Sequence, residues 1–122
     1  MFYLRPILFL LVAASLLPAA DTVNFNRDVR PLLANHCFRC HGPDSETREA
    51  DLRLDKQASA STVLDSGERA IVPGNPDASS LIQRIRSEDE GERMPPSDLG
   101  PPLKEAEIAI LEQWIRDGAT YD

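Results

Sequence analysis

The sequence is poor in the residues that most metal, redox and disulfide sites need. Its 122 residues include two cysteines, two histidines, two methionines and one tryptophan. Basic residues are also in the minority, with 13 lysines and arginines against 20 aspartates and glutamates and a formal charge of −7. Such an acidic chain repels phosphate groups, which argues against binding to nucleic acid and favours protein partners with a basic docking face.

A long apolar run is missing as well. Residues 6–20 carry no charge and follow the basic Arg5, but this run is shorter than the roughly 20 residues that a transmembrane helix needs. The pattern predicts a signal peptide over residues 1–20 that is removed on export, and no stable membrane span. An uncleaved anchor is the alternative. Because no cysteine lies near this segment, a lipid anchor is not expected.

Residues 21–122 are too few for two independent hydrophobic cores, and they show no internal repeat. We therefore expect one domain over residues 21–122. Loss of residues 1–20 removes a single basic residue, Arg5, and leaves 12 basic residues against 20 acidic ones, a formal charge of −8. The exported domain is predicted to be acidic and to reside in the periplasm or an equivalent extracytoplasmic compartment.

Helical spacing marks the start of this domain. Apolar residues recur at intervals of three and four over residues 24–36, which predicts a helix with one buried face. Pro31 is tolerated only within a first turn, so this helix is expected to start near Asn26 or Asp28, either of which could be its N-cap. The predicted buried face consists of Phe25, Val29, Leu32, Leu33 and His36.

The same spacing returns at the end of the domain. Residues 104–117 predict a second amphipathic helix, and Gly118 follows as its C-cap. Lys104 stands where a serine, threonine or aspartate N-cap is typical, so a less firm helix start is expected. The predicted buried face consists of Ile108, Leu111, Trp114 and Ile115.

Mainly loop is expected between these two helices. Residues 45–74 are polar and show weak periodicity, which allows a short helix or an extended piece. Residues 73–76 predict a turn, after which Asp77 could cap a short helix with Leu81, Ile82 and Ile85 facing inward. The predicted fold class is all-α, with about three to four helices.

The motif with the clearest chemistry is Cys37-Phe38-Arg39-Cys40-His41, the C-x-x-C-H pattern of covalent haem attachment. Cysteines three residues apart project from one side of a helical turn, so both sulfurs can add to the two vinyl groups of one porphyrin. The imidazole of His41 then lies beneath the ring as the proximal iron ligand, with its other nitrogen donating to a carbonyl. The pattern predicts one haem c with its iron.

Three alternatives remain for these residues. A thioredoxin-type dithiol needs no histidine and lies at a helix start after a strand, whereas Cys37 follows a predicted helix. A zinc site would need four ligands, including His36, from a window of six residues. A disulfide between Cys37 and Cys40 would be strained and would close almost no loop.

Haem iron usually takes a second axial ligand, and the mature chain offers few. Met94 is its one methionine, and His36 is its one histidine besides His41. His36 directly precedes the attached cysteine and is expected near the ring edge, so Met94 is the predicted distal ligand. Pro95 and Pro96 make its loop rigid. The alternative is that Met94 fills a gap in the core.

Other side chains give weaker signals. Trp114 falls on a predicted apolar helix face, which indicates a core residue rather than an electron relay. Arg53, Arg69 and Arg93 could pair with haem propionates, but composition alone favours none of them.

With these motifs in place, the chain resembles the cytochrome c domain of planctomycete-type proteins. The resemblance covers residues 24–119 and rests on four stretches of the sequence. These are Asn26-Arg27-Asp28-Val29-Arg30-Pro31 with residues 37–42, Leu52-Arg53-Leu54-Asp55, residues 71–76 with Ser80-Leu81-Ile82, and Met94-Pro95-Pro96 with Glu107-Ile108 and Trp114-Ile115.

The resemblance implies a cytochrome c-like fold, in which the first and last helices cross beside the haem and His41 and Met94 are the axial ligands. The function it implies is single-electron transfer with redox protein partners, rather than enzymatic catalysis. Two alternatives stay open. The domain could be the N-terminal electron-transfer or sensing module of a larger multidomain protein, or a peroxidase-like haem enzyme if Met94 is labile.

Overall fold

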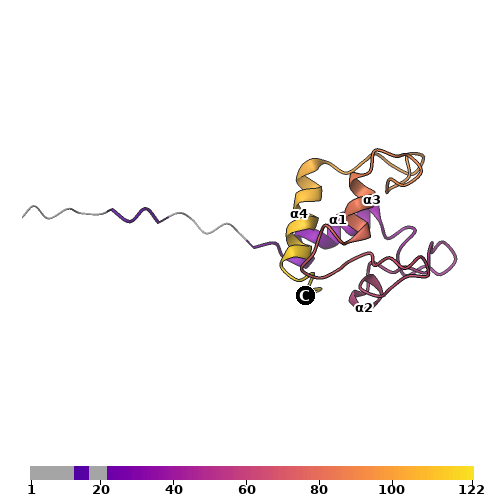
Figure 1. The fold of residues 1–122 in the computed structure, drawn as a ribbon, viewed down its shortest axis with the longest axis horizontal. Helices are drawn as coiled ribbons and strands as arrows, with labels where there is room; N and C mark the ends of the chain where they lie inside the picture. Colours follow the sequence, from indigo (N-terminus) through magenta and orange to yellow (C-terminus); the bar gives the residue numbers. More distant parts are fainter. Residues whose placement is uncertain (1–12, 17–21) are drawn as a thin grey trace, which may run out of the picture.

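The computed structural model of the protein describes residues 13–16 and 22–122. The predicted signal peptide, residues 1–20, therefore lies almost entirely outside the described residues. Among the residues that are described, no helix has the length and apolar character needed to cross a membrane. Figure 1 shows the folded part, in which α1 (Arg30–His36), α3 (Ser80–Arg86) and α4 (Glu105–Arg116) lie together, whereas the short α2 (Gln57–Ala60) lies among the long loops.

The helical elements are short, and most of the chain between them is loop. In chain order they are η1 (Phe25–Val29, one π-helical turn), α1 (Arg30–His36), α2 (Gln57–Ala60), α3 (Ser80–Arg86) and α4 (Glu105–Arg116). The described residues contain no β-strand, and their only β pairing is an isolated antiparallel bridge between Val63 and Arg69. The prediction of an all-α chain is confirmed, as is the prediction that residues 45–74 are mainly loop.

The first helical segment starts earlier than its sequence suggested. Asn24 is the N-cap: its side chain accepts a hydrogen bond from the Arg27 amide at 2.8 Å. The Asn24 amide in turn donates to Asp28 Oδ2 at 2.8 Å, and bonds from Arg27 and Asn24 lower the pKa of Asp28 to about 2. The prediction of Asn26 or Asp28 as N-cap was wrong, because an extra π-helical turn precedes Pro31 and holds the proline in the first turn of α1.

Helix α4 has no N-cap side chain, and the carboxylate of Glu107 bonds the backbone at its start instead. The Lys104 amide donates to Glu107 Oε1 at 2.9 Å, and this bond is the main reason why the pKa of Glu107 is lowered. This carboxylate supplies one half of a capping box, and the other half is absent because a lysine ammonium cannot accept a hydrogen bond from the Glu107 amide. At the other end, Gly118 adopts a left-handed φ of 113° as predicted for a C-terminal glycine.

Helix α3 also begins at a different cap from the one expected. Its N-cap is Ser79 rather than Asp77, and Leu81, Ile82 and Ile85 are buried as predicted. The Ser79 hydroxyl does not cap the helix. It instead accepts from the Val72 amide at 2.9 Å and donates to the Asn75 carbonyl at 2.9 Å, which fixes the predicted turn at residues 73–76.

An aromatic cluster holds the two ends of the domain together. The ring of Phe25 stacks on Tyr121 with centroids 4.4 Å apart and contacts Trp114 at 5.6 Å. This cluster seats η1 on α4, so the first and last helical segments are in contact. The Tyr121 hydroxyl donates to the Leu54 carbonyl at 2.8 Å, which ties the long loop to the same cluster.

Helix α4 also packs against α3, and the two share an exposed ion-pair network. Arg86 contacts Glu112 at 2.6 Å and Glu105 at 2.9 Å. The fully buried apolar core lies between α1, α3, α4 and the loops on either side of α2. Its largest members are Leu33, Leu54, Ile71, Leu111 and Ile115.

Truncation of Phe25 should test the aromatic cluster. Phe25 is 2% exposed, so Phe25→Ala should lower the free energy of unfolding by about 3–5 kcal/mol through lost burial and an unfilled cavity. Thermal or denaturant unfolding of the purified protein would measure this loss. Val63→Ala is the control, since Val63 is 53% exposed and its truncation should change stability by at most about 0.5 kcal/mol. Equal effects of both substitutions would contradict the role given to Phe25.

Candidate functional site

A single large cavity brings together the four residues predicted to bind the cofactor. Its volume is about 620 Å³, within the range of roughly 300–1,000 Å³ that is typical of small-molecule and cofactor sites. Cys37, Cys40 and His41 line it from the turn after α1, and Met94 lines it from the loop between α3 and α4. Apolar residues supply much of the remaining wall, among them Leu52, Leu54, Ala70, Leu81 and Ile85.

The cysteine turn continues directly from α1. The Cys37 amide donates to the Leu33 carbonyl at 2.8 Å, which extends the helical bonding beyond His36. The amides of Cys40 and His41 then both donate to the Cys37 carbonyl, at 3.2 and 2.9 Å. A tight turn of this kind keeps the two thiols and the imidazole beside the same cavity.

Both cysteines are free and partly buried. Burial, with a smaller contribution from Cys40, raises the pKa of Cys37 to about 12. A reactive dithiol needs the opposite, a thiol pKa that is lowered toward neutrality. The dithiol alternative therefore gains no support from the surroundings of Cys37.

The zinc alternative gains none from the geometry either. Across residues 13–16 and 22–122, no group of three or more histidine, cysteine, aspartate or glutamate side chains is placed to hold a metal ion. His36 is engaged elsewhere: its Nε2 lies 3.3 Å from Glu107 Oε2, a contact that joins the end of α1 to the first turn of α4.

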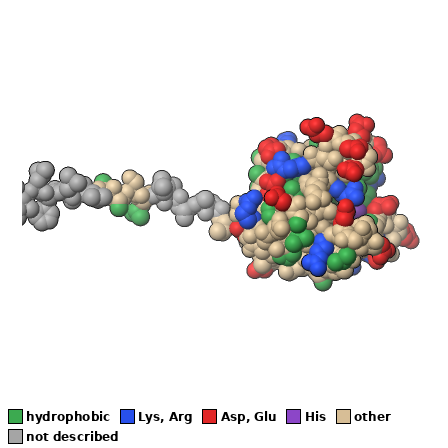
Figure 2. All heavy atoms as spheres, viewed as in Figure 1, with side chains coloured by type: hydrophobic (Ala, Val, Ile, Leu, Met, Phe, Trp, Pro, Cys, Tyr) green, Lys and Arg blue, Asp and Glu red, His purple; other side chains and the backbone are tan. Residues whose placement is uncertain are grey.

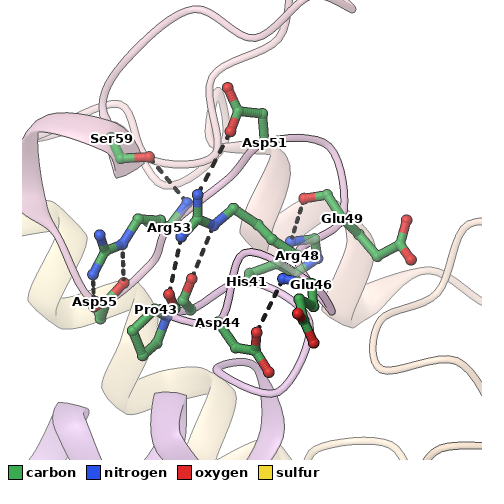
Figure 3. Close-up of polar contacts among 11 residues, drawn as sticks. His41, Pro43, Asp44, Glu46, Arg48, Glu49, Asp51, Arg53, Asp55 and Ser59 are labelled. Atoms are coloured by element: carbon green, nitrogen blue, oxygen red, sulfur yellow. Dashed lines mark hydrogen bonds and ion pairs between the residues drawn. The ribbon is translucent and has the colours of Figure 1, made fainter.

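His41 is held as a neutral ligand would be. Its Nδ1 lies 3.2 Å from the Glu49 carbonyl, and because a carbonyl oxygen can only accept, Nδ1 carries the proton (Figure 3). The lone pair of the imidazole is then on Nε2. Burial lowers the pKa of His41, which further favours the neutral ring.

The Glu49 carbonyl is presented by a strained turn. It also accepts from the Leu52 amide at 3.2 Å, and the two residues between them, Ala50 and Asp51, have φ values of 55° and 51°. This is the pattern of a type I′ turn, which usually has glycine, asparagine or aspartate at its central positions, so that Ala50 is the unfavourable residue of the two. Alanine in the left-handed region costs about 1–2 kcal/mol, so the rest of the loop must hold this turn in place.

Met94 is anchored through its backbone. Its amide donates to the Arg84 carbonyl at the end of α3, at 3.1 Å, and its side chain is partly buried against the core. A cis peptide bond joins it to Pro95, and both Pro95 and Pro96 line the cavity with it. The segment forms neither helix nor strand, as its prolines predicted.

The three arginines considered for haem propionates are in different situations. Arg53 is paired with Asp55 by two hydrogen bonds of 3.1 and 2.7 Å, and Arg69 is exposed. Arg93 has a buried Nε for which the described residues provide no hydrogen-bond partner. Two other arginines, Arg39 and Arg84, line the cavity and were not singled out from the sequence. Trp114 is buried in the aromatic cluster.

Sequence reasoning also missed the loop that orients His41. Glu49 acts through its main-chain carbonyl, and a carbonyl is common to every residue type. Arg48 precedes it and contacts the backbone beside the cysteine turn, which no spacing in the sequence reveals.

The comparison with known families bears on this same region. A family model described as Planctomycete cytochrome C matches residues 37–98, about half of the chain. The matched region runs from the cysteine turn through α2 and α3 to Met94 and its prolines, so it contains the four predicted binding residues. No curated protein and no solved structure matches the chain.

The residue after the motif offers a test of the turn. A Cβ on Gly42 would overlap the Phe38 carbonyl, so Gly42→Ala should distort the backbone beside His41 and lower stability by about 1–3 kcal/mol. Thermal unfolding would measure the change. Gly100→Ala is the matched control, because its added Cβ would lie 3.9 Å from Pro95 in ordinary contact. If Gly42→Ala unfolded at the temperature of Gly100→Ala, the turn described here would be incorrect.

Proposed function

Since the chain belongs to the planctomycete cytochrome c family, we propose that it is an exported electron carrier that holds one haem c in the cavity beside α1. Cys37 and Cys40 form the thioether bonds, and His41 and Met94 are the axial iron ligands. One observation supports this assignment above the others: two sequence segments more than fifty residues apart bring these four side chains to one cavity.

The residues present fit a haem on chemical grounds. A thioether and a neutral imidazole are common axial ligands of haem iron, and covalent attachment needs two thiols that are free. The apolar wall formed by residues such as Leu54 and Leu81 suits the faces of a macrocycle. The fold is accordingly proposed to be cytochrome c-like.

In this proposal the protein supplies position and surroundings, and the haem supplies a one-electron Fe(III)/Fe(II) couple. His41 offers Nε2 because Nδ1 is engaged by the Glu49 carbonyl. Met94 offers its sulfur from a backbone position fixed at the end of α3. If His41 and Met94 both bound the iron, no position on it would be left for a substrate, which would favour electron transfer over catalysis.

Among the three arginines considered from the sequence, Arg93 is the one with a buried N–H that has no acceptor among the described residues, although the arginines that line the cavity are Arg39 and Arg84. A buried guanidinium N–H without an acceptor is costly, and a carboxylate would satisfy it. Arg53 already has its carboxylate in Asp55, and Arg69 is exposed. The proposal therefore prefers Arg93 among the three arginines.

The remaining parts of the proposal concern export and partners. Residues 1–20 act as the signal peptide, residues 21–122 form the cytochrome domain, and the protein works in the periplasm or an equivalent compartment. Acidic side chains are prominent along the outline of the face in Figure 2. Docking to redox proteins with a basic face would then be transient and sensitive to salt.

Covalent attachment is the first test of this function. The exported protein should retain its haem through extraction with acidic organic solvent and show a low-spin spectrum with a methionine-to-iron band. Cys37→Ala combined with Cys40→Ala should release or fail to acquire haem, because both thioether bonds are lost. The visible spectrum before and after extraction measures both results. Extractable or absent haem in the unaltered protein would refute the proposal.

The reduction potential of the haem tests whether Met94 is an iron ligand. Met94→His should lower the reduction potential, because imidazole stabilises Fe(III) more than a thioether does. A redox titration followed by visible absorption would measure the shift. Ser97→His is the control, since it adds a histidine at an exposed position of the same loop. An unchanged potential in Met94→His would count against methionine ligation, and fast binding of cyanide or carbon monoxide by the unaltered protein would favour the haem-enzyme alternative.

A further inference from the structure

Three consecutive residues fasten the loop after the cysteine turn to that turn. The Thr47 hydroxyl donates to the Arg39 carbonyl at 2.9 Å, within the motif itself. The Glu49 amide donates to the Cys40 carbonyl at 2.7 Å. Arg48 lies between Thr47 and Glu49 in the sequence, and its side chain contacts the backbone of the two residues that follow His41.

Arg48 spans two neighbouring carbonyls with its guanidinium. Its Nε donates to the Gly42 carbonyl at 3.0 Å, and its Nη2 donates to the Pro43 carbonyl at 3.1 Å (Figure 3). The side chain is 18% exposed although it belongs to a surface loop. A planar fork with several N–H donors suits two adjacent acceptors better than a single ammonium does.

The charge of Arg48 has only a weak partner. Asp51 Oδ1 lies 3.8 Å from Nη1, and the Asp51 side chain is 94% exposed. An ion pair in such a position contributes little because water screens it. The position of the Arg48 side chain is therefore set mainly by its hydrogen bonds to the two carbonyls.

These contacts act on the turn that faces His41. Alanine at position 50 disfavours the positive φ that this type I′ turn requires, so contacts from outside the turn are needed to keep the Glu49 carbonyl where it is. Arg48 is the residue next to that carbonyl, and it ties the start of the turn to Gly42, the residue next to His41. The bond from Arg48 thus links the residue before Glu49 to the residue after His41, which keeps the Glu49 carbonyl and the imidazole close to each other.

We propose that Arg48 is a positioning residue, whose bonds to the Gly42 and Pro43 carbonyls hold the Glu49 carbonyl against His41 Nδ1 and so set the orientation and donor strength of the imidazole. This inference rests on the proposed function, because its electronic effect is read at the haem. A firm Nδ1–H···O bond makes the imidazole a stronger donor and favours Fe(III). Loss of the restraint should raise the reduction potential.

Arg48→Lys separates this role from that of charge. Lysine keeps the positive charge but cannot span both carbonyls in one plane, so the potential should rise. If Arg48 acted only through its positive charge, the reduction potential of this variant would not change. The measurements are a redox titration and amide hydrogen exchange of the intact protein, with attention to the amides of Glu49, Leu52 and Leu54.

Arg53→Lys is the matched control. Arg53 belongs to the same loop, makes a forked contact with Asp55 and contacts none of the motif's carbonyls. This substitution should leave the potential unchanged. In Arg48→Lys the three loop amides should exchange faster, while those of α4 should exchange as in the unaltered protein.

Each outcome decides the proposal. A raised potential with faster loop exchange in Arg48→Lys, and neither in Arg53→Lys, supports it. Faster exchange with an unchanged potential would leave Arg48 a merely structural residue and overturn the link to His41. No change in either measurement would overturn the restraint itself. If the unaltered protein carries no covalent haem, the proposed function fails, and loop exchange still decides whether Arg48 restrains the turn.

Discussion

The mutual packing of Phe25, Trp114 and Tyr121 is the interaction on which the rest of the structure depends. It fixes η1 against α4, and α1 continues from η1 without a break. The position of the cysteine turn follows, because that turn comes directly after the end of α1. Through its hydroxyl, Tyr121 also holds Leu54 and with it one wall of the cavity.

A cavity of this size in so small a domain is enclosed mostly by loops. The helices are short, and most of the rest of the wall comes from loop residues within positions 49–70 and 94–99. These loops keep their shape through hydrogen bonds to carbonyls, as Ser79 and Arg48 illustrate, since they bury few large side chains of their own. An apolar ligand bonded to the chain would extend the core into this space, which a domain with little apolar surface needs.

The amphipathic helices and the four binding residues could be predicted from the sequence because their signals are local. Spacing gave the buried faces of Val29, Leu33, Leu111 and Trp114, and the cysteine motif with one methionine gave the side chains that meet at the cavity. The haem ligation itself stays a prediction. Helix starts were less accurate, since caps such as Asn24 depend on backbone geometry that several nearby polar residues could equally satisfy.

What the sequence could not supply is the identity of the groups that act through the main chain. The group facing His41 is the amide carbonyl of Glu49, and any residue at that position would offer the same oxygen. An amide carbonyl neither gains nor loses a proton between acidic and alkaline conditions, whereas a carboxylate in its place would. The contact that orients the imidazole is therefore insulated from the acidity of the surroundings, although the protein that carries it is rich in carboxylates.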